Sequence, residues 1–361
     1  MVLLHSHTVR AGDEEPALRL AGSLWHTIAD APVAAMCFDV SATTPLAKSI
    51  EWGSRPAPSV TLSREDVERA LETASLPDFA SLISSREART VLCKWLVLRV
   101  VERLKWGHML LVIDDGVPMV YANSSTGEPS VVHRPDLART LHGEADISCI
   151  YAAHVLRSEF LGGMGVVECC SVDTDLILIG CLNAFEGLRI RLHHFDKASK
   201  LPVFQTVDCA QLAASMSARY KLPLMEWATL VASRGTDYVQ GGLILRAPSD
   251  WDVYLTNCAQ ALCDVKRTTG GRDLVTEERV DAAALHTTFV AASARMKRSK
   301  LRYEREDGVL ARLAWNVLYM RHAPMRGGQG LDCEQFGWGV NAQGQVEARR
   351  VWRATHGWTG A

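Results

Sequence analysis

The chain has 361 residues, of which 48% are hydrophobic and 22% are charged, and its formal net charge is −2. This composition is typical of a globular protein with a sizeable core, and it excludes both a disordered chain and a polycation that binds nucleic acid through its total charge. No apolar stretch approaches the roughly 20 residues that span a bilayer, and residues 1–10 lack the pattern of a signal peptide. We therefore expect a soluble intracellular protein, nuclear or cytoplasmic.

The ten cysteines form no Cys-x-x-Cys pair and show no spacing typical of a zinc site. Half of them fall inside apolar runs, where a free thiol behaves as a small hydrophobic side chain. The sequence therefore predicts buried thiols, as suits a reducing compartment. These residues are Cys37, Cys149, Cys169, Cys170 and Cys181.

Hydrophobic periodicity and capping signals predict alternating helices and strands over the first 240 or so residues. In chain order these are a helix over 15–29, a strand over 33–38, helices over 63–73 and 84–105, a strand over 109–113, a turn-rich stretch over 122–129, a helix over 144–160, strands over 165–170, 176–181 and 188–192, and helices over 208–218 and 223–233. This alternation indicates an α/β fold with a mainly parallel sheet. Residues 273–321 are predicted to be mostly helical, and residues 322–361 show little periodicity.

Carboxylates follow several of these elements. Two pairs spaced i and i+2, Glu144 with Asp146 and Asp173 with Asp175, lie about one helix and one strand apart. Asp39 follows an earlier apolar strand, and Asp237 follows a helix at a glycine turn. Since ligands bind at the carboxyl ends of strands in open α/β sheets, these six acids could converge on one cleft.

Carboxylates that share a cleft repel one another unless cations neutralise them, and a set of oxygen ligands without His or Cys favours Mg²⁺ or Mn²⁺ over Zn²⁺. We therefore expect a metal site with phosphodiester chemistry. Taken singly, each acid is also explained as an ordinary surface residue or as an acid at a helix start.

The ordered set of acidic motifs resembles the flap-endonuclease/XPG superfamily of structure-specific 5′ nucleases, which have a PIN-like fold. The matching motifs are Cys37-Phe38-Asp39 with Pro45-Leu46-Ala47-Lys48, Gly143-Glu144-Ala145-Asp146, Val172-Asp173-Thr174-Asp175, and Gly235-Thr236-Asp237-Tyr238. The resemblance covers residues 15–245.

The resemblance implies a PIN-like domain over residues 1–245, with three α/β/α layers and a mainly parallel central sheet. It also implies a helical, arch-like insertion over residues 57–140. A mostly helical C-terminal region with an irregular tail would follow over residues 246–361. The acids implied to bind two Mg²⁺ or Mn²⁺ ions and to act in catalysis are Asp39, Glu144, Asp146, Asp173, Asp175 and Asp237.

Two features depart from the family pattern. Family members have a further Asp at the end of an N-terminal strand, whereas this sequence opens with Met1-Val2-Leu3-Leu4-His5, which is similar to the segment after that Asp. The helix-hairpin-helix that follows Gly-x-Asp-Tyr in the family is not evident at Val239-Gln240-Gly241-Gly242. The first departure implies that the first strand and one metal-site carboxylate are missing, so that either the gene model starts late or the protein is a damaged nuclease. The second departure leaves open a relative that acts on other DNA ends or on RNA.

Basic residues provide candidate contacts to phosphates. Lys48 and Arg55 follow the first acidic motif, where the family places residues that grip phosphate. The others lie on the predicted helix over 84–105 and in the basic run over 295–302, and they are Lys94, Arg99, Arg298 and Lys300. A solvated helix surface or, for the basic run, a nuclear import signal explains the same residues.

The sequence thus predicts a DNA-binding, metal-dependent nuclease that cuts DNA or RNA near 5′ ends or branches, as flap endonucleases and 5′→3′ exonucleases of DNA repair do. The alternative is a catalytically inactive PIN-like scaffold that binds nucleic acid or a protein. The C-terminal region is the expected surface for any protein partner.

Overall fold

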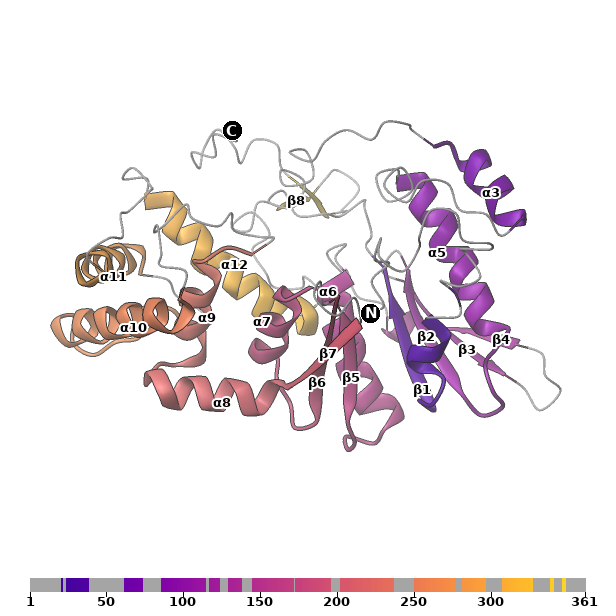
Figure 1. Cartoon of the computed structure of the whole chain (residues 1–361), viewed down its shortest axis with the longest axis horizontal. Helices are drawn as coiled ribbons and strands as arrows, with labels where there is room; N and C mark the ends of the chain where they lie inside the picture. The colour runs from indigo at the N-terminus through magenta and orange to yellow at the C-terminus, as the bar shows by residue number, and fades with distance from the viewer. Residues whose placement is uncertain are drawn as a thin grey trace.

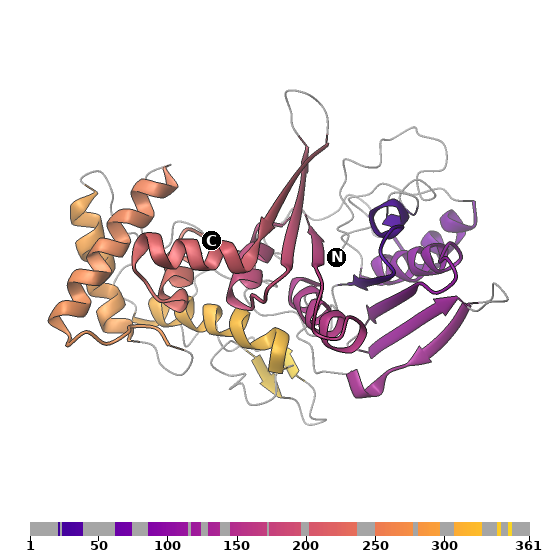
Figure 2. The same ribbon diagram turned by 90° about the horizontal axis from the view of Figure 1, so that it is seen from below.

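The computed structural model describes part of the chain. The described residues are 21, 24–38, 62–73, 86–114, 117–123, 129–137, 145–171, 173–195, 202–236, 250–276, 281–296, 307–326, 338–340 and 346–348. They form a mixed α/β structure in which two small sheets lie beside a group of helices (Figures 1 and 2).

The first sheet has four strands in the order β1-β2-β3-β4. β1 and β2 are parallel, and the other two pairs are antiparallel. Residues 24–28 are helical and precede β1. The bounds are β1 Val33–Cys37, α3 Arg64–Glu72, α5 Arg86–Val101, β2 Met109–Asp114, β3 Val117–Asn123, β4 Pro129–His133 and η2 Pro135–Leu137.

The second sheet has three strands in the order β5-β6-β7, with β5 parallel to β6 and β7 antiparallel to it. The helix before it ends in a π-helical turn, η3. The bounds are α6 Ala145–Val155, η3 Leu156–Phe160, β5 Val167–Ser171, α7 Asp175–Leu182, β6 Leu188–Phe195 and β7 Pro202–Asp208.

The remaining described elements are mainly helical, and α8, α9, α10 and α11 lie on the far side of the second sheet from β1 (Figure 1). Their bounds are α8 Cys209–Tyr220, α9 Leu224–Ala232, α10 Trp251–Thr268, α11 Ala282–Arg295, α12 Asp307–Arg326, β8 Trp338–Val340 and β9 Val346–Ala348. No helix in the described ranges is both long and apolar enough to cross a lipid bilayer.

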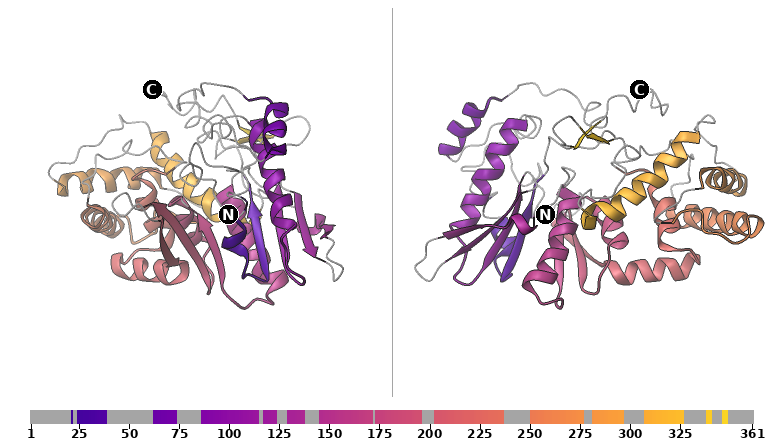
Figure 3. Two further views of the ribbon diagram at one scale, coloured as in Figure 1. Left: turned by 45° about the vertical axis from the view of Figure 1, so that its right-hand side comes forward. Right: turned by 180° about the vertical axis from the view of Figure 1, so that it is seen from behind.

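Two hydrophobic cores meet at the first sheet. Ala34 and Met36 of β1 face the core that α3 and α5 cover, whereas Cys37 belongs to the larger core built around α6 and the second sheet. Alternate residues of a strand point to opposite faces, so β1 and β2 contribute to both cores. α5 and α6 therefore cover opposite faces of the first sheet (Figure 3).

Local capping explains where several helices begin. In α3 the Oγ atom of Ser63 accepts a hydrogen bond from the Asp66 N–H at 3.1 Å, and Asp66 Oδ2 accepts one from the Ser63 N–H at 3.2 Å. At the starts of α8, α10 and α11, a side-chain oxygen of Asp208, Asp250 and Asp281, respectively, accepts backbone N–H groups of the first turn. These caps support the predicted helix starts at residues 63 and 208.

Most predicted elements are present, but the sheets are less parallel than expected. Only β1–β2 and β5–β6 are parallel pairs among the described strands. The turn-rich stretch predicted over 122–129 joins β3 to β4, and the segment over 202–208, for which no element was predicted, forms β7. Antiparallel neighbours need only a short turn, so these hairpins leave a weaker sequence signal than a βαβ unit.

The strand predicted over 176–181 is wrong, because these residues lie in helix α7. The run Leu176–Cys181 is apolar on all sides and most of its side chains are buried. A short run that is buried all round has no period by which a helix can be told from a strand. Its helical state follows from packing against α6, α8 and β6.

The segment over 57–140, for which a helical, arch-like insertion was predicted, contains α3 and α5 but also β2, β3 and β4. Here α5 packs on the first sheet through Leu92, Leu96 and Val100, which are fully buried. The described part of this segment therefore supplies three of the four strands of the first sheet and the helices that cover one of its faces.

Candidate functional site

Asp146 lies in the first turn of α6, as the sequence predicts, and only 5% of its surface is exposed. α6 packs against β1, β5 and α7. Burial raises the pKa of the Cys37 thiol at the end of β1, and the charges of Cys149 and Asp146 raise it further. Cys37 and Cys149 also line one cavity, so the first half of α6 lies beside the carboxyl end of β1.

Asp173 and Asp175 lie where β5 ends and α7 begins. The Ser171 hydroxyl accepts a hydrogen bond from the Asp173 N–H at 2.9 Å, and Asp173 Oδ1 accepts one from the Asp175 N–H at 2.9 Å. Such side-chain turns start helices because they satisfy backbone N–H groups that have no partner within the helix. Both acids are half-buried.

These acids therefore sit on neighbouring elements of one core, at the start of α6 and at the start of α7. Both helix starts present a positive dipole end, which favours negative charge. The oxygen-only donor set suits a hard divalent cation. However, no group of three metal-binding side chains lies close enough together to hold an ion within the described ranges.

The other three predicted ligands, Asp39, Glu144 and Asp237, lie outside the described residues, as do Lys48, Arg55, Arg298 and Lys300. The described structure brings their neighbours into the same region in two cases. Cys37 ends β1 two residues before Asp39, and Ala145 begins α6 directly after Glu144.

Lys94 and Arg99 lie on α5, on the opposite face of the first sheet from α6. The Lys94 side chain is exposed, whereas the Arg99 guanidinium pairs with Glu102 at 2.9 Å and lies 5.3 Å from the ring centre of Trp95. The structure therefore does not bring these two basic residues next to Asp146.

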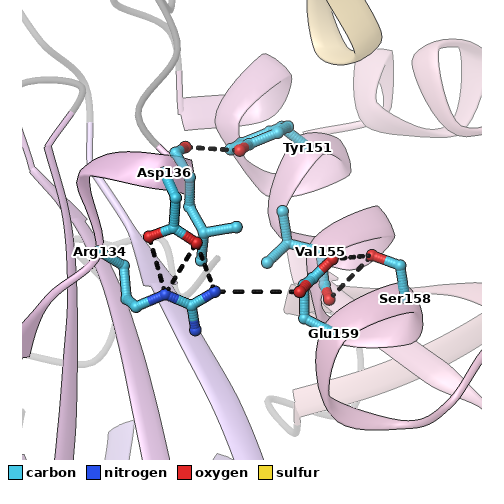
Figure 4. A network of polar contacts seen from close by, with 7 residues as sticks. Arg134, Asp136, Tyr151, Val155, Ser158 and Glu159 are labelled. Atoms are coloured by element: carbon cyan, nitrogen blue, oxygen red, sulfur yellow. Dashed lines mark hydrogen bonds and ion pairs between the residues drawn. The ribbon is translucent and has the colours of Figure 1, made fainter.

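A network of ion pairs and hydrogen bonds connects α6 and η3 to the end of the first sheet (Figure 4). The Arg134 guanidinium lies 2.7 Å from Asp136 and 3.9 Å from Glu159 of η3, and the Tyr151 hydroxyl donates to the Leu137 carbonyl at 2.5 Å. The pair with Arg134 lowers the pKa of the Asp136 carboxyl. These contacts orient the helix that carries Asp146.

Two arrangements beside the acids were not predicted, although the burial of the cysteines was. Ser171 supports the Asp173 turn, and its only sequence signal is a hydroxyl residue two positions before an Asp. The second is a cluster of buried thiols, Cys37, Cys149 and Cys169, which line one cavity. Every cysteine in the described residues is a free thiol, and Cys181 is likewise buried, which confirms that these positions do not form disulfides.

No protein-family model matches the chain, and the comparison with curated proteins finds no match. A functional assignment therefore rests on the residues and their arrangement.

Proposed function

We propose that the protein is a divalent-metal-dependent nuclease that hydrolyses phosphodiester bonds in DNA or RNA, of the 5′ flap endonuclease or 5′→3′ exonuclease type. The observation that carries the proposal is the buried acid at the start of α6, Asp146, on a helix that packs against both β5 and α7, the elements between which Asp173 and Asp175 lie. The motif resemblance supplies the substrate class.

In this proposal the acids at the two helix starts hold the metal ions. Asp146, Asp173 and Asp175 are the described part of the donor set, and Asp39, Glu144 and Asp237 complete it. Bound divalent ions supply an activated water and stabilise charge that develops on phosphate oxygens. The finer proposal of a PIN-like arrangement rests on this site together with the parallel pairs β1–β2 and β5–β6.

The protein's own residues fix the geometry of the acids. Ser171 and the Asp173 turn hold the backbone that carries Asp175, and the Arg134 network holds α6. Such supporting contacts matter because a metal site tolerates little displacement of its ligands.

The test is cleavage of labelled 5′-flap DNA, nicked duplex DNA and single-stranded RNA with Mg²⁺ or Mn²⁺. The parent chain is compared with the double variant Asp173→Asn/Asp175→Asn. The matched control is Asp208→Asn, because Asp208 also ends a strand and begins a helix but lies at β7–α8. Asn keeps the hydrogen-bond acceptor in all three positions and removes only the charge.

We expect metal-dependent cutting that the double variant loses and the Asp208→Asn control retains. Equal cutting by the double variant and the parent chain would refute the site. No cutting by the parent chain, together with retained binding of the nucleic acid, would refute the enzyme and favour the inactive scaffold.

A further inference from the structure

Two cysteine thiols contact each other where α6 packs on β5. Cys149 lies on α6 and Cys169 lies on β5, and both side chains belong to the same hydrophobic core. The Cys169 thiol donates a hydrogen bond to the Cys149 sulfur, so the two sulfur atoms are neighbours. Both are free thiols in this structure. We call these two residues the thiol pair.

The thiol pair is reached only by small molecules. Both residues are 3% exposed, and together with Cys37 they line a cavity of about 200 Å³. This volume is far more than the roughly 10–15 Å³ that one water molecule needs. The cavity therefore has room for a reagent as small as hydrogen peroxide beside the two sulfur atoms.

The hydrogen bond makes the two thiols unequal. It lowers the pKa of Cys149, because a donated hydrogen bond stabilises the thiolate. The same hydrogen bond, together with burial, raises the pKa of Cys169. The thiolate is the form of cysteine that attacks an oxidant. Cys149 is therefore suited to react first, while Cys169 keeps its proton until a bond forms between the two.

The thiol pair lies next to the acids of the proposed metal site. Asp146 precedes Cys149 by three residues, so it lies on the neighbouring turn and on the same side of α6. Ser171 follows Cys169 by two residues and points to the same face of β5. The Ser171 hydroxyl accepts the hydrogen bond from the Asp173 N–H.

Both groups lie in the same direction from the thiol pair. Only residues 161–166 join η3 to β5, and α6 packs on β5, so the helix and the strand run in opposite directions. The path toward the start of α6 therefore leads the same way as the path toward the end of β5. A shift of α6 against β5 at the thiol pair thus changes the position of Asp146 relative to Ser171.

We propose that the thiol pair is a modification site at which hydrogen peroxide forms a Cys149–Cys169 disulfide, and that this bond lowers the affinity of the neighbouring acids for divalent ions. The effect on the acids rests on the proposed function, whereas the bond itself does not. A disulfide holds its sulfur atoms about 2.05 Å apart, well inside any hydrogen-bond distance, so its formation draws α6 toward β5. A metal site tolerates only small displacements of its ligands.

The reaction has two steps. The Cys149 thiolate attacks one oxygen of hydrogen peroxide, which forms an S–O bond, breaks the O–O bond and releases hydroxide. That hydroxide takes the proton of Cys169, whose sulfur attacks the Cys149 sulfur, forms the S–S bond and displaces a second hydroxide. The second hydroxide takes up the proton that Cys149 lost on ionisation. The two thiols thus lose two electrons, and one peroxide is reduced to two water molecules.

The test is peptide mapping of the full chain after treatment with hydrogen peroxide. The remaining thiols are alkylated, the protein is digested without reductant, and linked peptides are identified by mass spectrometry. We expect a Cys149–Cys169 linkage that dithiothreitol removes. The matched control in the same sample is Cys181 with Cys209, a buried and hydrogen-bonded pair on α7 and α8 that does not line the cavity. We expect this second pair to stay reduced.

Two substitutions separate the roles of the two sulfur atoms. Cys169→Ser keeps a hydroxyl donor for Cys149 but removes the second sulfur, so peroxide should leave Cys149 as a sulfenic acid that dimedone labels. Cys149→Ser should leave Cys169 without such a label, because that thiol keeps its proton. Thermal unfolding of both variants verifies that they are folded.

Binding of Mn²⁺ alone, followed by electron paramagnetic resonance, measures the effect on the acids. We expect the affinity to be about 10–100-fold lower in the oxidised chain than in the reduced chain, and to recover after dithiothreitol is added and removed. Cys149→Ser should keep its Mn²⁺ affinity through the same treatment.

A linkage of Cys149 to Cys37, or no linkage at all, would overturn the modification site. Equal linkage of Cys181 to Cys209 would also overturn it, because the reaction would then not be specific to the thiol pair. A Cys149–Cys169 linkage with unchanged Mn²⁺ affinity would overturn the effect on the acids. Absence of Mn²⁺ binding by the reduced chain would overturn the proposed function and that effect together, whereas the linkage would still establish the modification site.

Discussion

The Oδ1 atom of Asp173 accepts a hydrogen bond from the backbone N–H of Asp175 at 2.9 Å. The side chain of one predicted metal ligand thus holds the backbone that carries the other. The two acids therefore have a structural role at the start of α7 in addition to any role with a cation.

Substitution of Asp173 separates these two roles. Asp173→Ala removes the acceptor at the helix start and should lower the free energy of unfolding by about 1 kcal/mol, whereas Asp173→Asn keeps the acceptor and should change it little. Urea denaturation measures both. We expect cleavage to be lost in both variants, and retained cleavage in Asp173→Asn would show that the carboxylate acts only as a helix cap.

Gly180 tests the helical state of α7. A Cβ atom at this position would lie 2.8 Å from the Cys209 Sγ atom and 3.3 Å from the Ile190 Cδ1 atom. Gly180→Ala therefore should destabilise the protein by about 1–3 kcal/mol through overpacking, although Ala favours a helix by roughly 1 kcal/mol.

The double variant Gly180→Ala/Cys209→Ala should regain part of that loss, because it removes the nearest atom. Thermal unfolding of the two single variants and the double variant measures the coupling. Strictly additive effects would contradict the close approach of α7 and α8.

His154 makes stability depend on pH. Burial lowers the pKa of its ring below the usual 6.5, and the ring Nε2 atom lies 3.1 Å from the Asn183 carbonyl oxygen. Below pH 6.5, the unfolded chain therefore binds a proton at His154 more readily than the folded protein does. This contribution to stability is full above pH 6.5 and is lost as the pH falls below it.

We expect the free energy of unfolding to fall by at most about 1.4 kcal/mol per pH unit from this group below pH 6.5. His154→Gln keeps a donor for the Asn183 carbonyl but cannot titrate, so the decline should be shallower in that variant. Urea denaturation at several pH values measures the slopes, and equal slopes would exclude His154 as the cause.

Glu226 anchors α9 to α10 through a buried ion pair. Its side chain is fully buried and lies 3.1 Å from the Lys266 Nζ atom, and its Oε1 atom accepts the Leu274 N–H at 2.7 Å. Glu226→Ala leaves Lys266 without this partner and should destabilise the protein by about 3–5 kcal/mol.

Asp273→Asn is the matched control, because Asp273 pairs with the same lysine but its side chain is 42% exposed. In urea denaturation, this variant should lower the free energy of unfolding by well under half as much as Glu226→Ala does. Equal losses in the two variants would mean that burial of Glu226 does not set the cost.

Much of the secondary structure follows from local sequence alone. The capping box at Ser63 and Asp66, the apolar run of β2 and the alternation Leu188-Arg189-Ile190-Arg191-Leu192 each determine an element through contacts within a few residues. The placement of Asp146 at the first turn of a helix belongs to the same class. These features depend on short-range sterics and hydrogen bonds, which a sequence pattern encodes directly.

Other features were decided by contacts between distant segments. The run Leu176–Cys181 is a helix because α6, α8 and β6 surround it, and the sheets are largely antiparallel because β3, β4 and β7 return as hairpins. The position of α5 on the face of the sheet opposite α6 removes Lys94 and Arg99 from the acids.

The sequence by itself therefore determined which acids and capping residues stand at the ends of which elements. Only the tertiary structure decided that α6 packs against β1, β5 and α7, which brings these elements into one core. The physical reason is that chain-local preferences set φ and ψ one residue at a time, whereas burial of apolar surface acts between residues that are far apart in the sequence.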